Sequence, residues 1–385
     1  MSYFQNLSLE LIEAILDYLD VKSLENALRI AKFLQYPSER RLYYTVALWT
    51  ERTSSQGLGL EDRQAIFLNT VFNNDLLARH VVRLALGGYS TMEVDSRVNG
   101  LIGGSMKKMI NIKKLALFGY PYILHGNLHS LPFALTSLII SIDTSAYTAL
   151  DLPLLSILRA HPNLKELDLG STELPSDLVE VLKAEQDGSS HESGILCPHL
   201  KRFDGYNETL RFFLPMRTIE RGATIGSGTE YIRDDNLPDF WLTPTLIKSY
   251  QHLRVLEVSP EYDADSLFLS TIAPYLTSLT HFRAMTGIHT QGTEDHLLES
   301  LGRMPALKCF TLRVYLVTQL ATVETALEVV RRVCGVCPDI AEIFVQGRDG
   351  TEMMYYHYLR GEGLQSSLAS DEAAFGSHDA WLHES

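Results

Sequence analysis

Cysteine is scarce in this chain, with four residues among 385. They stand at Cys197, Cys309, Cys334 and Cys337, too few and too scattered for a disulfide-stapled secreted fold, and their number agrees with a reducing compartment. Cys334 and Cys337 have the spacing of half a zinc or redox site, yet no second cysteine pair or histidine pair completes four ligands. We therefore predict no metal site and no cofactor.

Positive charge is also in short supply. Lys and Arg number 33 against 47 Asp and Glu, a formal net charge of −14, and no basic stripe occurs. Because phosphate contacts need clustered Lys and Arg, the sequence argues against a nucleic-acid partner. Acidic residues gather in residues 171–196 and 361–385, which we expect to be solvated loops or tails.

Long apolar runs are absent. No stretch reaches the roughly 18 apolar residues of a membrane-spanning helix, and the N-terminus has acids where a secretory signal has its basic region. The sequence predicts no membrane partner and a cytoplasmic or nuclear location, or both.

Catalytic motifs are missing as well. None of the 13 histidines stands in a His-Glu-x-x-His motif, and no Gly-x-Ser-x-Gly elbow occurs. The glycine-rich stretch from Gly222 to Gly228 lacks the Gly-Lys-Ser/Thr ending of a phosphate-binding loop. We therefore predict no catalytic residue. A hydrolase whose active site is assembled from distant segments is the least favoured alternative.

What the chain does have is a run of three helix-like segments at residues 7–19, 23–33 and 38–49. Apolar residues recur at helical spacing in the first segment: Leu11, Ile12, Ile15, Leu16 and Leu19. Ser8 is expected to cap the first helix. Pro37 is expected to end the second segment, because it lacks an amide hydrogen, and Ser38 to cap the third.

These segments resemble an F-box. Leu7-Ser8-Leu9-Glu10-Leu11 and Ile15-Leu16-Asp17-Tyr18-Leu19 are similar to the family's Leu-Pro-x-Glu-Leu and Ile-Leu-x-Tyr-Leu. Leu24 stands where the family has Asp-Leu. Two departures are Ser8 in place of the proline and a loose match at Lys32 and Phe33. Losing the proline is expected to make the opening loop less preorganised and to weaken docking.

The resemblance implies docking on the Skp adaptor and, through it, on a cullin ubiquitin ligase. It implies these adaptor-binding residues: Leu7, Ser8, Leu9, Leu11, Ile15, Leu16, Leu19 and Leu24. Residues that form the core of the three helices cannot also face a partner. The alternative is that the helices only cap and seal the first repeat.

The rest of the chain repeats a Leu-x-x-Leu-x-Leu-like string typical of a short strand with one buried face. Clear copies begin at Leu164, Leu253 and Leu307. Weaker copies begin at Ile112, Leu135, Leu276 and Ile340. The intervals are 23, 29 and 36 residues from Ile112 to Leu200, and 23, 31 and 33 residues from Leu253 to Ile340. Helix-like pieces lie between the copies.

This pattern resembles the irregular leucine-rich repeats that follow F-boxes in large fungal families. It implies an α/β fold, in which a small three-helix domain at residues 1–50 precedes a curved solenoid of parallel strands and helices at residues 51–360. An acidic flexible tail would follow at residues 361–385. The alternative is another layered α/β fold. Residues 202–241 fit the repeat least well and are expected to form either a projecting insertion or an ordered connection.

Together these features predict a non-catalytic substrate-recognition subunit whose repeats bind an unknown target protein. Polar residues that alternate with the buried ones are the candidate target-binding residues: Lys165, Glu166, Asp168, Arg254, Glu257, Lys308, Thr311 and Arg313. A second hypothesis keeps the fold but makes the chain a ubiquitin-independent scaffold or protein-interaction module.

Overall fold

The computed structural model describes residues 7–48, 60–87, 96–118, 131–141, 153–170, 172, 174–187, 194–224, 241–258, 263–286, 291–314, 323–349 and 352–368. The chain divides into two compact units, Met1–Leu164 and Lys165–Ser385. Within the described residues, no helix combines the length and the apolar character needed to cross a membrane.

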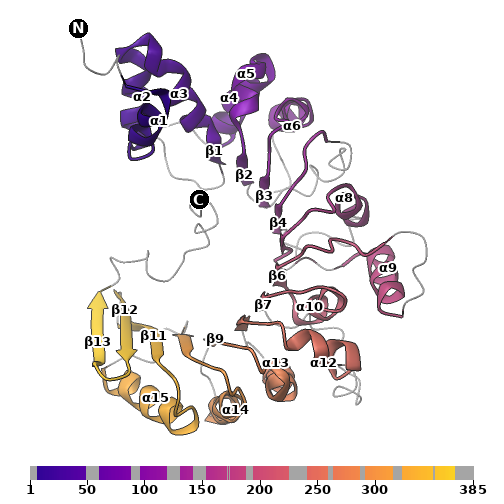
Figure 1. Cartoon of the computed structure of the whole chain (residues 1–385), viewed down its shortest axis with the longest axis vertical. Helices are drawn as coiled ribbons and strands as arrows, with labels where there is room; N and C mark the ends of the chain where they lie inside the picture. The colour runs from indigo at the N-terminus through magenta and orange to yellow at the C-terminus, as the bar shows by residue number, and fades with distance from the viewer. Residues whose placement is uncertain are drawn as a thin grey trace. The chain divides into compact units, whose positions relative to one another are not determined.

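The first unit begins with three helices and continues as alternating helices and parallel strands (Figure 1). Its elements are α1 (Leu9–Leu16), α2 (Val21–Ile30), α3 (Lys32–Tyr44), β1 (Thr45–Leu48), α4 (Leu60–Asn73), α5 (Asp75–His80), β2 (Arg83–Gly87), α6 (Ser96–Lys108), β3 (Lys114–Phe118), β4 (Ser137–Ser141) and α8 (Leu154–Ala160). Strands β1 to β4 pair in sequence order, all parallel. Leu84, Leu115 and Leu138 stand in register and are fully buried.

The second unit continues the same alternation and closes with an antiparallel meander. Its elements are β5 (Glu166–Asp168), α9 (Ser176–Gln186), β6 (Arg202–Gly205), α10 (Asn207–Phe213), β7 (Arg221–Thr224), α12 (Pro244–Tyr250), β8 (Val255–Val258), α13 (Asp263–Ile272), η4 (Ala273–Tyr275), β9 (His281–Thr286), α14 (Gln291–Gly302), β10 (Cys309–Val314), α15 (Val323–Val336), β11 (Glu342–Asp349), β12 (Glu352–Leu359) and β13 (Gly363–Leu368). Strands β5 to β11 are parallel, and β12 and β13 are antiparallel. Figure 1 shows α9 to α15 on one side of these strands.

A repeated hydrogen-bond pattern aligns each strand with the next. The carbonyl of Lys165 accepts from the backbone amides of Lys201 and Arg202, at 2.8 and 3.0 Å. The corresponding carbonyls of Lys201, Glu220, Arg254, Thr280 and Lys308 accept two amides of the following copy in the same way. Because one carbonyl accepts two amides where each of these parallel strands begins, the buried positions of successive copies stay in line.

Most predicted repeat copies coincide with strands. The copies that begin at Ile112, Leu135, Leu164, Leu253, Leu307 and Ile340 lead into β3, β4, β5, β8, β10 and β11. The copy predicted at Leu276 is wrong by three residues. Phe282 pairs with Leu256 and Phe310, so the copy begins at Leu279. Leu276 instead directly follows η4 and is buried, and its spacing from Leu279 matches the first two leucines of the repeat string.

The structure corrects the predicted boundaries of the N-terminal helices. Helix α2 ends at Ile30 because Ala31 is extended, with φ −153° and ψ 135°, and α3 runs through Pro37. Pro37 lies in the second turn, where its ring removes the amide bond to the carbonyl four residues earlier and also crowds that carbonyl. Leu34 before it and Leu42 after it both pack on the helical core, which holds α3 together across the proline. Ser38 therefore caps nothing.

Two further predictions of secondary structure are wrong. Residues 45–48, predicted as helix, form β1, which pairs with β2. Residues 363–368, predicted as the start of the tail, form β13, which pairs with β12. In both cases pairing with a neighbouring strand decides the conformation, and local pattern does not reveal it. Residues 369–385 lie outside the described residues.

Residues 202–241 supply two ordinary strands of the sheet. Phe203 lies in β6, and β7 falls within the second stretch where a strand piece was expected, residues 218–225. Residues 225–240, the part predicted to project or connect, lie outside the described residues.

Candidate docking surface

The three N-terminal helices have a small apolar core of their own. Ile12, Leu16, Leu24 and Ala27 are between 3% and 7% exposed. Partly buried side chains pack around them: Leu7, Leu19, Phe33, Leu34 and Leu42. Of the residues that the F-box resemblance implies for adaptor binding, Leu16 and Leu24 are therefore in this core. Leu7 and Leu19 lie at its border.

The remaining apolar residues of α1 face solvent. Leu9, Leu11 and Ile15 are 50%, 54% and 41% exposed, and Tyr18, just after the helix, is 91% exposed. Leu11, Ile15 and Tyr18 follow one another at helical spacing, so they form one stripe beside the buried stripe of Ile12 and Leu16. An exposed stripe of this kind indicates an interaction surface.

An apolar groove of about 350 Å³ adjoins this stripe. Its walls come from α1, α2 and the start of α3, and Ile15 lies at the point where stripe and groove meet. The groove is lined by Ile12, Ile15, Leu16, Leu19, Ser23, Ala27, Ile30, Ala31, Phe33 and Leu34. Ile30, also 76% exposed, extends the apolar surface onto α2. Stripe and groove together can receive apolar side chains of a partner helix.

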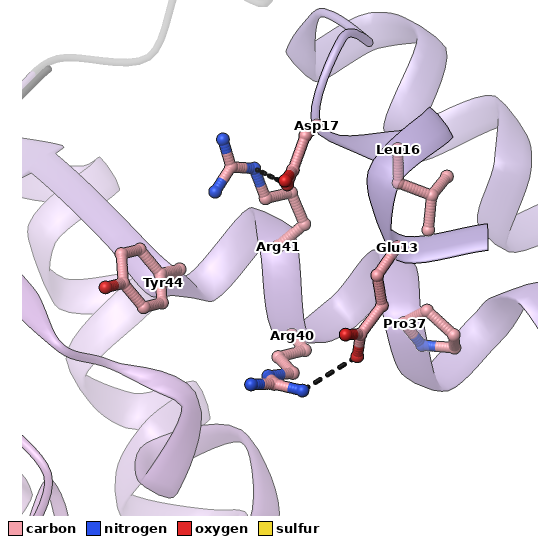
Figure 2. Close-up of a pocket in the computed structure, with 7 residues that line it drawn as sticks. All are labelled: Glu13, Leu16, Asp17, Pro37, Arg40, Arg41 and Tyr44. Carbon is pink, nitrogen blue, oxygen red and sulfur yellow. Dashed lines mark hydrogen bonds and ion pairs between the residues drawn. The ribbon is translucent and has the colours of Figure 1, made fainter. Parts of the chain in front are cut away.

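A second, charged cleft of about 190 Å³ lies between α1 and α3 (Figure 2). Arg40 Nη1 lies 2.7 Å from Glu13 Oε1, and Arg41 Nε lies 3.1 Å from Asp17 Oδ1. Glu13 belongs to α1 and Asp17 directly follows it, so the two pairs join α3 to α1 and its end, as Figure 2 shows. Because the four side chains are between 35% and 56% exposed, water screens these pairs and each contributes little stability.

The helix starts are set by side-chain caps. Ser8 Oγ accepts the Leu11 amide at 3.4 Å, a long hydrogen bond, and Asp20 Oδ1 accepts the Ser23 amide at 2.8 Å. Hydrogen bonding by the Ser23 side chain, and then by its amide, holds the pKa of Asp20 below its usual range. Ser8 has φ −65° and ψ 156°, a backbone conformation that proline also adopts. The prediction that Ser8 caps the first helix is confirmed by this geometry.

The candidate target-binding residues lie along strands β5, β8 and β10 of the second unit. Lys165, Arg254 and Lys308 directly precede these strands and are exposed, whereas Glu166, Asp168 and Glu257 are half-buried within them. Thr311 is 7% exposed in β10, between β9 and β11, and is the least accessible of the set. Arg313 belongs to β10, but its side chain lies outside the described residues.

Sequence reasoning missed several charged residues on the same strands. Arg202 and Asp204 lie on β6, and Arg221 lies on β7. Arg202 contacts Asp204 Oδ2 through Nε at 2.9 Å and Nη2 at 2.7 Å. Arg283 on β9 pairs with Glu257 at 3.0 Å. Alternation around Phe203 would have identified Arg202 and Asp204, but that copy lacks a second leucine.

The cysteines have the properties of packed side chains. Burial raises the pKa of Cys197 to about 12 and that of Cys337 to about 11, so both stay protonated at neutral pH and are poor nucleophiles and ligands. Among the described residues, no group of three or more His, Cys, Asp or Glu side chains is placed to hold a metal ion.

The order of elements defines an α/β repeat protein in which parallel strands alternate with helices within each unit. No protein-family model matches the chain, and no curated protein matches it. Among solved structures, it is similar to the leucine-rich repeat-containing protein LegL7 of Legionella pneumophila, at 12% identity and a TM-score of 0.38. The match covers 69% of this chain and 86% of that one. The repeat fold is therefore assigned from the order and pairing of the strands described above.

Proposed function

We propose that this chain is the non-catalytic substrate-recognition subunit of a ubiquitin ligase. Helices α1 to α3 dock on the Skp adaptor of a cullin complex, and the repeat strands bind a target protein, in the cytoplasm or nucleus. Partner proteins supply the chemistry, and this chain brings the target close to the ubiquitin-carrying enzyme.

The observation that carries the proposal is the division of labour within α1. Ile12 and Leu16 are buried in the helical core, while Leu11 and Ile15, next to them in sequence, remain 54% and 41% exposed beside an apolar groove. A helix that only sealed the first repeat would have no need of this second apolar stripe. An F-box needs both, because it must hold three helices together and bury apolar side chains against its adaptor.

A pull-down with purified Skp adaptor tests the proposal. The full chain should retain the adaptor, and a variant with Leu11→Asp and Ile15→Asp should lose it. The matched control is Leu76→Asp on α5, where Leu76 is 67% exposed and lies outside the groove. This control should bind like the parent. Circular dichroism of each variant shows whether the helices are intact.

Failure of the parent to bind, or equal binding by the double variant and the parent, would overturn adaptor docking. The ubiquitin-independent scaffold would then be the favoured function. That result would not bear on binding by the repeat strands, which is tested below at Asp168 and Asp204.

A further inference from the structure

Two carboxylates stand opposite each other in the sheet of the second unit. Asp168 on β5 is the direct parallel partner of Asp204 on β6. Leu167 and Phe203, the preceding pair in the same register, are fully buried. Because side chains alternate along a strand, both carboxylates project to the opposite face of the sheet, away from that buried pair. Like charges directly opposite each other destabilise a sheet, so two ionised carboxylates at these positions would lower its stability.

The Arg202 guanidinium contacts only one oxygen of the pair. Both nitrogens of Arg202 that contact Asp204 are directed at one oxygen, Oδ2. The other oxygen, Oδ1, is buried and has no hydrogen-bond partner, although Asp204 is only 6% exposed. Asp168 Oδ1 accepts the backbone amide of Gly170 at 2.8 Å. A buried carboxylate oxygen without a donor is costly, so the pair lacks a donor group.

The electrostatics agree with this geometry. Burial and the charge of Asp204 raise the pKa of Asp168 to about 7. Burial also raises the pKa of Asp204, against the opposing effect of Arg202 and Arg221. Two further acids are near, Glu166 on β5 and Glu257 on β8, and Glu257 is paired with Arg283 on β9 at 3.0 Å. The surroundings therefore hold too little positive charge for two ionised carboxylates.

A metal ion does not suit this site, since two carboxylates without a third side-chain ligand are not a metal-binding group in the described chain. A guanidinium or ammonium group suits it better, because each donates several hydrogen bonds and needs no fixed coordination number. Asp168 is half-buried and so leaves one side of the pair open to solvent.

We propose that Asp168 and Asp204 together anchor one cationic side chain, arginine or lysine, of a partner protein segment that lies extended across the strands of the second unit. This inference rests on the proposed function in one respect, that these strands bind a target protein. Parallel strands lie about 4.8 Å apart, so a segment crossing them meets one polar row after another. Lys165, exposed just before β5, repels a cation at the amino end of that strand and favours a position at the carboxyl end, where Asp168 lies.

The probes are four extended nonapeptides of serine and glycine that differ only in the central residue, which is arginine, lysine, citrulline or glutamate. Binding is followed on the full chain, labelled with ¹³C at aspartate carboxyls, by the shifts of the Asp168 and Asp204 resonances. These are assigned with the variants Asp168→Asn and Asp204→Asn. The arginine and lysine peptides should shift both resonances and lower the apparent pKa of Asp168. The citrulline and glutamate peptides should shift neither.

Asp168→Asn should weaken the arginine peptide about tenfold, the loss expected for one hydrogen-bonded charge. Glu180→Gln, at an exposed position on helix α9, is the matched control and should change affinity less than about twofold. Asn keeps the shape of Asp, so the fold of the variant is preserved, and its amide spectrum checks this. Equal shifts with arginine and citrulline, an unaffected Asp168→Asn variant, or no shift with any peptide would each overturn the proposal.

The test is independent of adaptor docking. The variant with Leu11→Asp and Ile15→Asp should bind the arginine peptide as the parent does, because those residues belong to α1 in the first unit. Failure of the parent chain to bind the adaptor, together with binding of the arginine peptide, would therefore remove the ligase role and leave the cation site standing.

Discussion

Glu185 and Arg217 form a buried ion pair, with 2.6 Å between Oε2 and Nη2 and only 1% of each side chain exposed. Arg217 also donates to the carbonyls of Leu196, Phe213 and Pro215, and Glu185 Oε1 accepts the Leu196 amide at 2.7 Å. The pair thereby joins α9 to the backbone before β6 and to the end of α10.

Two turns with unusual backbone angles lie beside this pair. Cys197 has φ 47° and Met216 has φ 63°, in the left-handed region that side chains other than glycine rarely adopt. Each costs free energy and persists only where the surroundings hold it. The hydrogen bonds from Arg217 to Leu196 and Pro215, next to these two residues, hold both turns in place.

Arg217→Met should therefore destabilise the second unit strongly. Removing one partner of a buried pair leaves the other charge uncompensated, which costs about 3–5 kcal/mol. The control is Lys201→Met, which breaks the Lys201–Glu220 pair of 2.9 Å, where both side chains are 48% exposed. That change should cost less than about 1 kcal/mol. Hydrogen exchange of the second unit at increasing urea concentration measures the loss of unfolding free energy in both variants. Equal losses would contradict the assigned role of Arg217.

Leu16→Ala should mainly lower stability, whereas Ile15→Ala should mainly weaken adaptor binding. Leu16 is 3% exposed in the helical core, so its truncation should cost about 2–5 kcal/mol. Ile15 is 41% exposed, so its truncation should cost less than about 1 kcal/mol while weakening adaptor binding. Thermal unfolding and adaptor titration of the two variants separate core from surface. A marked loss of stability in Ile15→Ala would contradict the division of α1.

Ser8→Pro should strengthen adaptor binding. Ser8 has φ −65°, the angle that the proline ring imposes, and its cap bond to Leu11 is long at 3.4 Å. The substitution restricts the loop before α1, so less conformational freedom is lost on docking. We expect a gain of about twofold to fivefold, since preorganising one residue contributes about 0.4–1 kcal/mol. Calorimetric titration checks this, with Ser8→Ala as the control that loses the cap without gaining rigidity.

Asp168 should make stability decrease as pH rises. An aspartate of the unfolded chain has a pKa of about 3.9, whereas burial and Asp204 raise the pKa of Asp168 to about 7 in the fold. Between these values the folded chain holds a proton that the unfolded chain has lost. Stability from this group is therefore complete below about pH 4 and is lost as pH rises through about 7.

Asp168→Asn should flatten that part of the pH profile, and Glu166→Gln on the same strand should leave it unchanged. Unfolding of each variant in urea between pH 4 and 8 measures the effect. An Asp168→Asn profile with the same slope as the parent would contradict the raised pKa.

Sequence pattern was sufficient where a repeat copy has leucine at its buried positions. Leu167, Leu256 and Leu312 mark β5, β8 and β10 because each buried side chain is large and apolar. β7 was harder to recognise, since Gly222 stands in register with Phe203 and Leu256 where other copies have a large residue. The antiparallel strand β13 carries no repeat string, so nothing in its local sequence distinguishes it from a tail.

The docking surface was only half predictable. Helical spacing put Leu11, Ile12, Ile15, Leu16 and Leu19 on one apolar stripe. Which of them are buried depends on how α2 and α3 pack against α1, a tertiary property. The Asp168–Asp204 pair was out of reach for a similar reason. Asp204 is 36 residues from Asp168 in the chain, and only the register of β5 with β6 brings the two together.

Gly222 stands at a buried position of the repeat where other copies have a large side chain, and Leu210 of α10 packs against it instead. A Cβ atom built on Gly222 would lie 3.6 Å from Leu210 of α10 and 3.6 Å from Leu256, an ordinary packing distance. Gly222→Ala should therefore stabilise the second unit by about 0.4–1 kcal/mol, since it restricts the unfolded chain without a clash.

Gly222→Leu restores the residue type of the other copies and should nevertheless destabilise by about 1–3 kcal/mol, because Leu210 already occupies the space. The double variant Gly222→Leu with Leu210→Ala should recover part of that loss, since the two changes share one site and are not additive. Thermal unfolding of the three variants measures the coupling. If Gly222→Leu were neutral alone, Leu210 would not be the side chain that completes the repeat at β7.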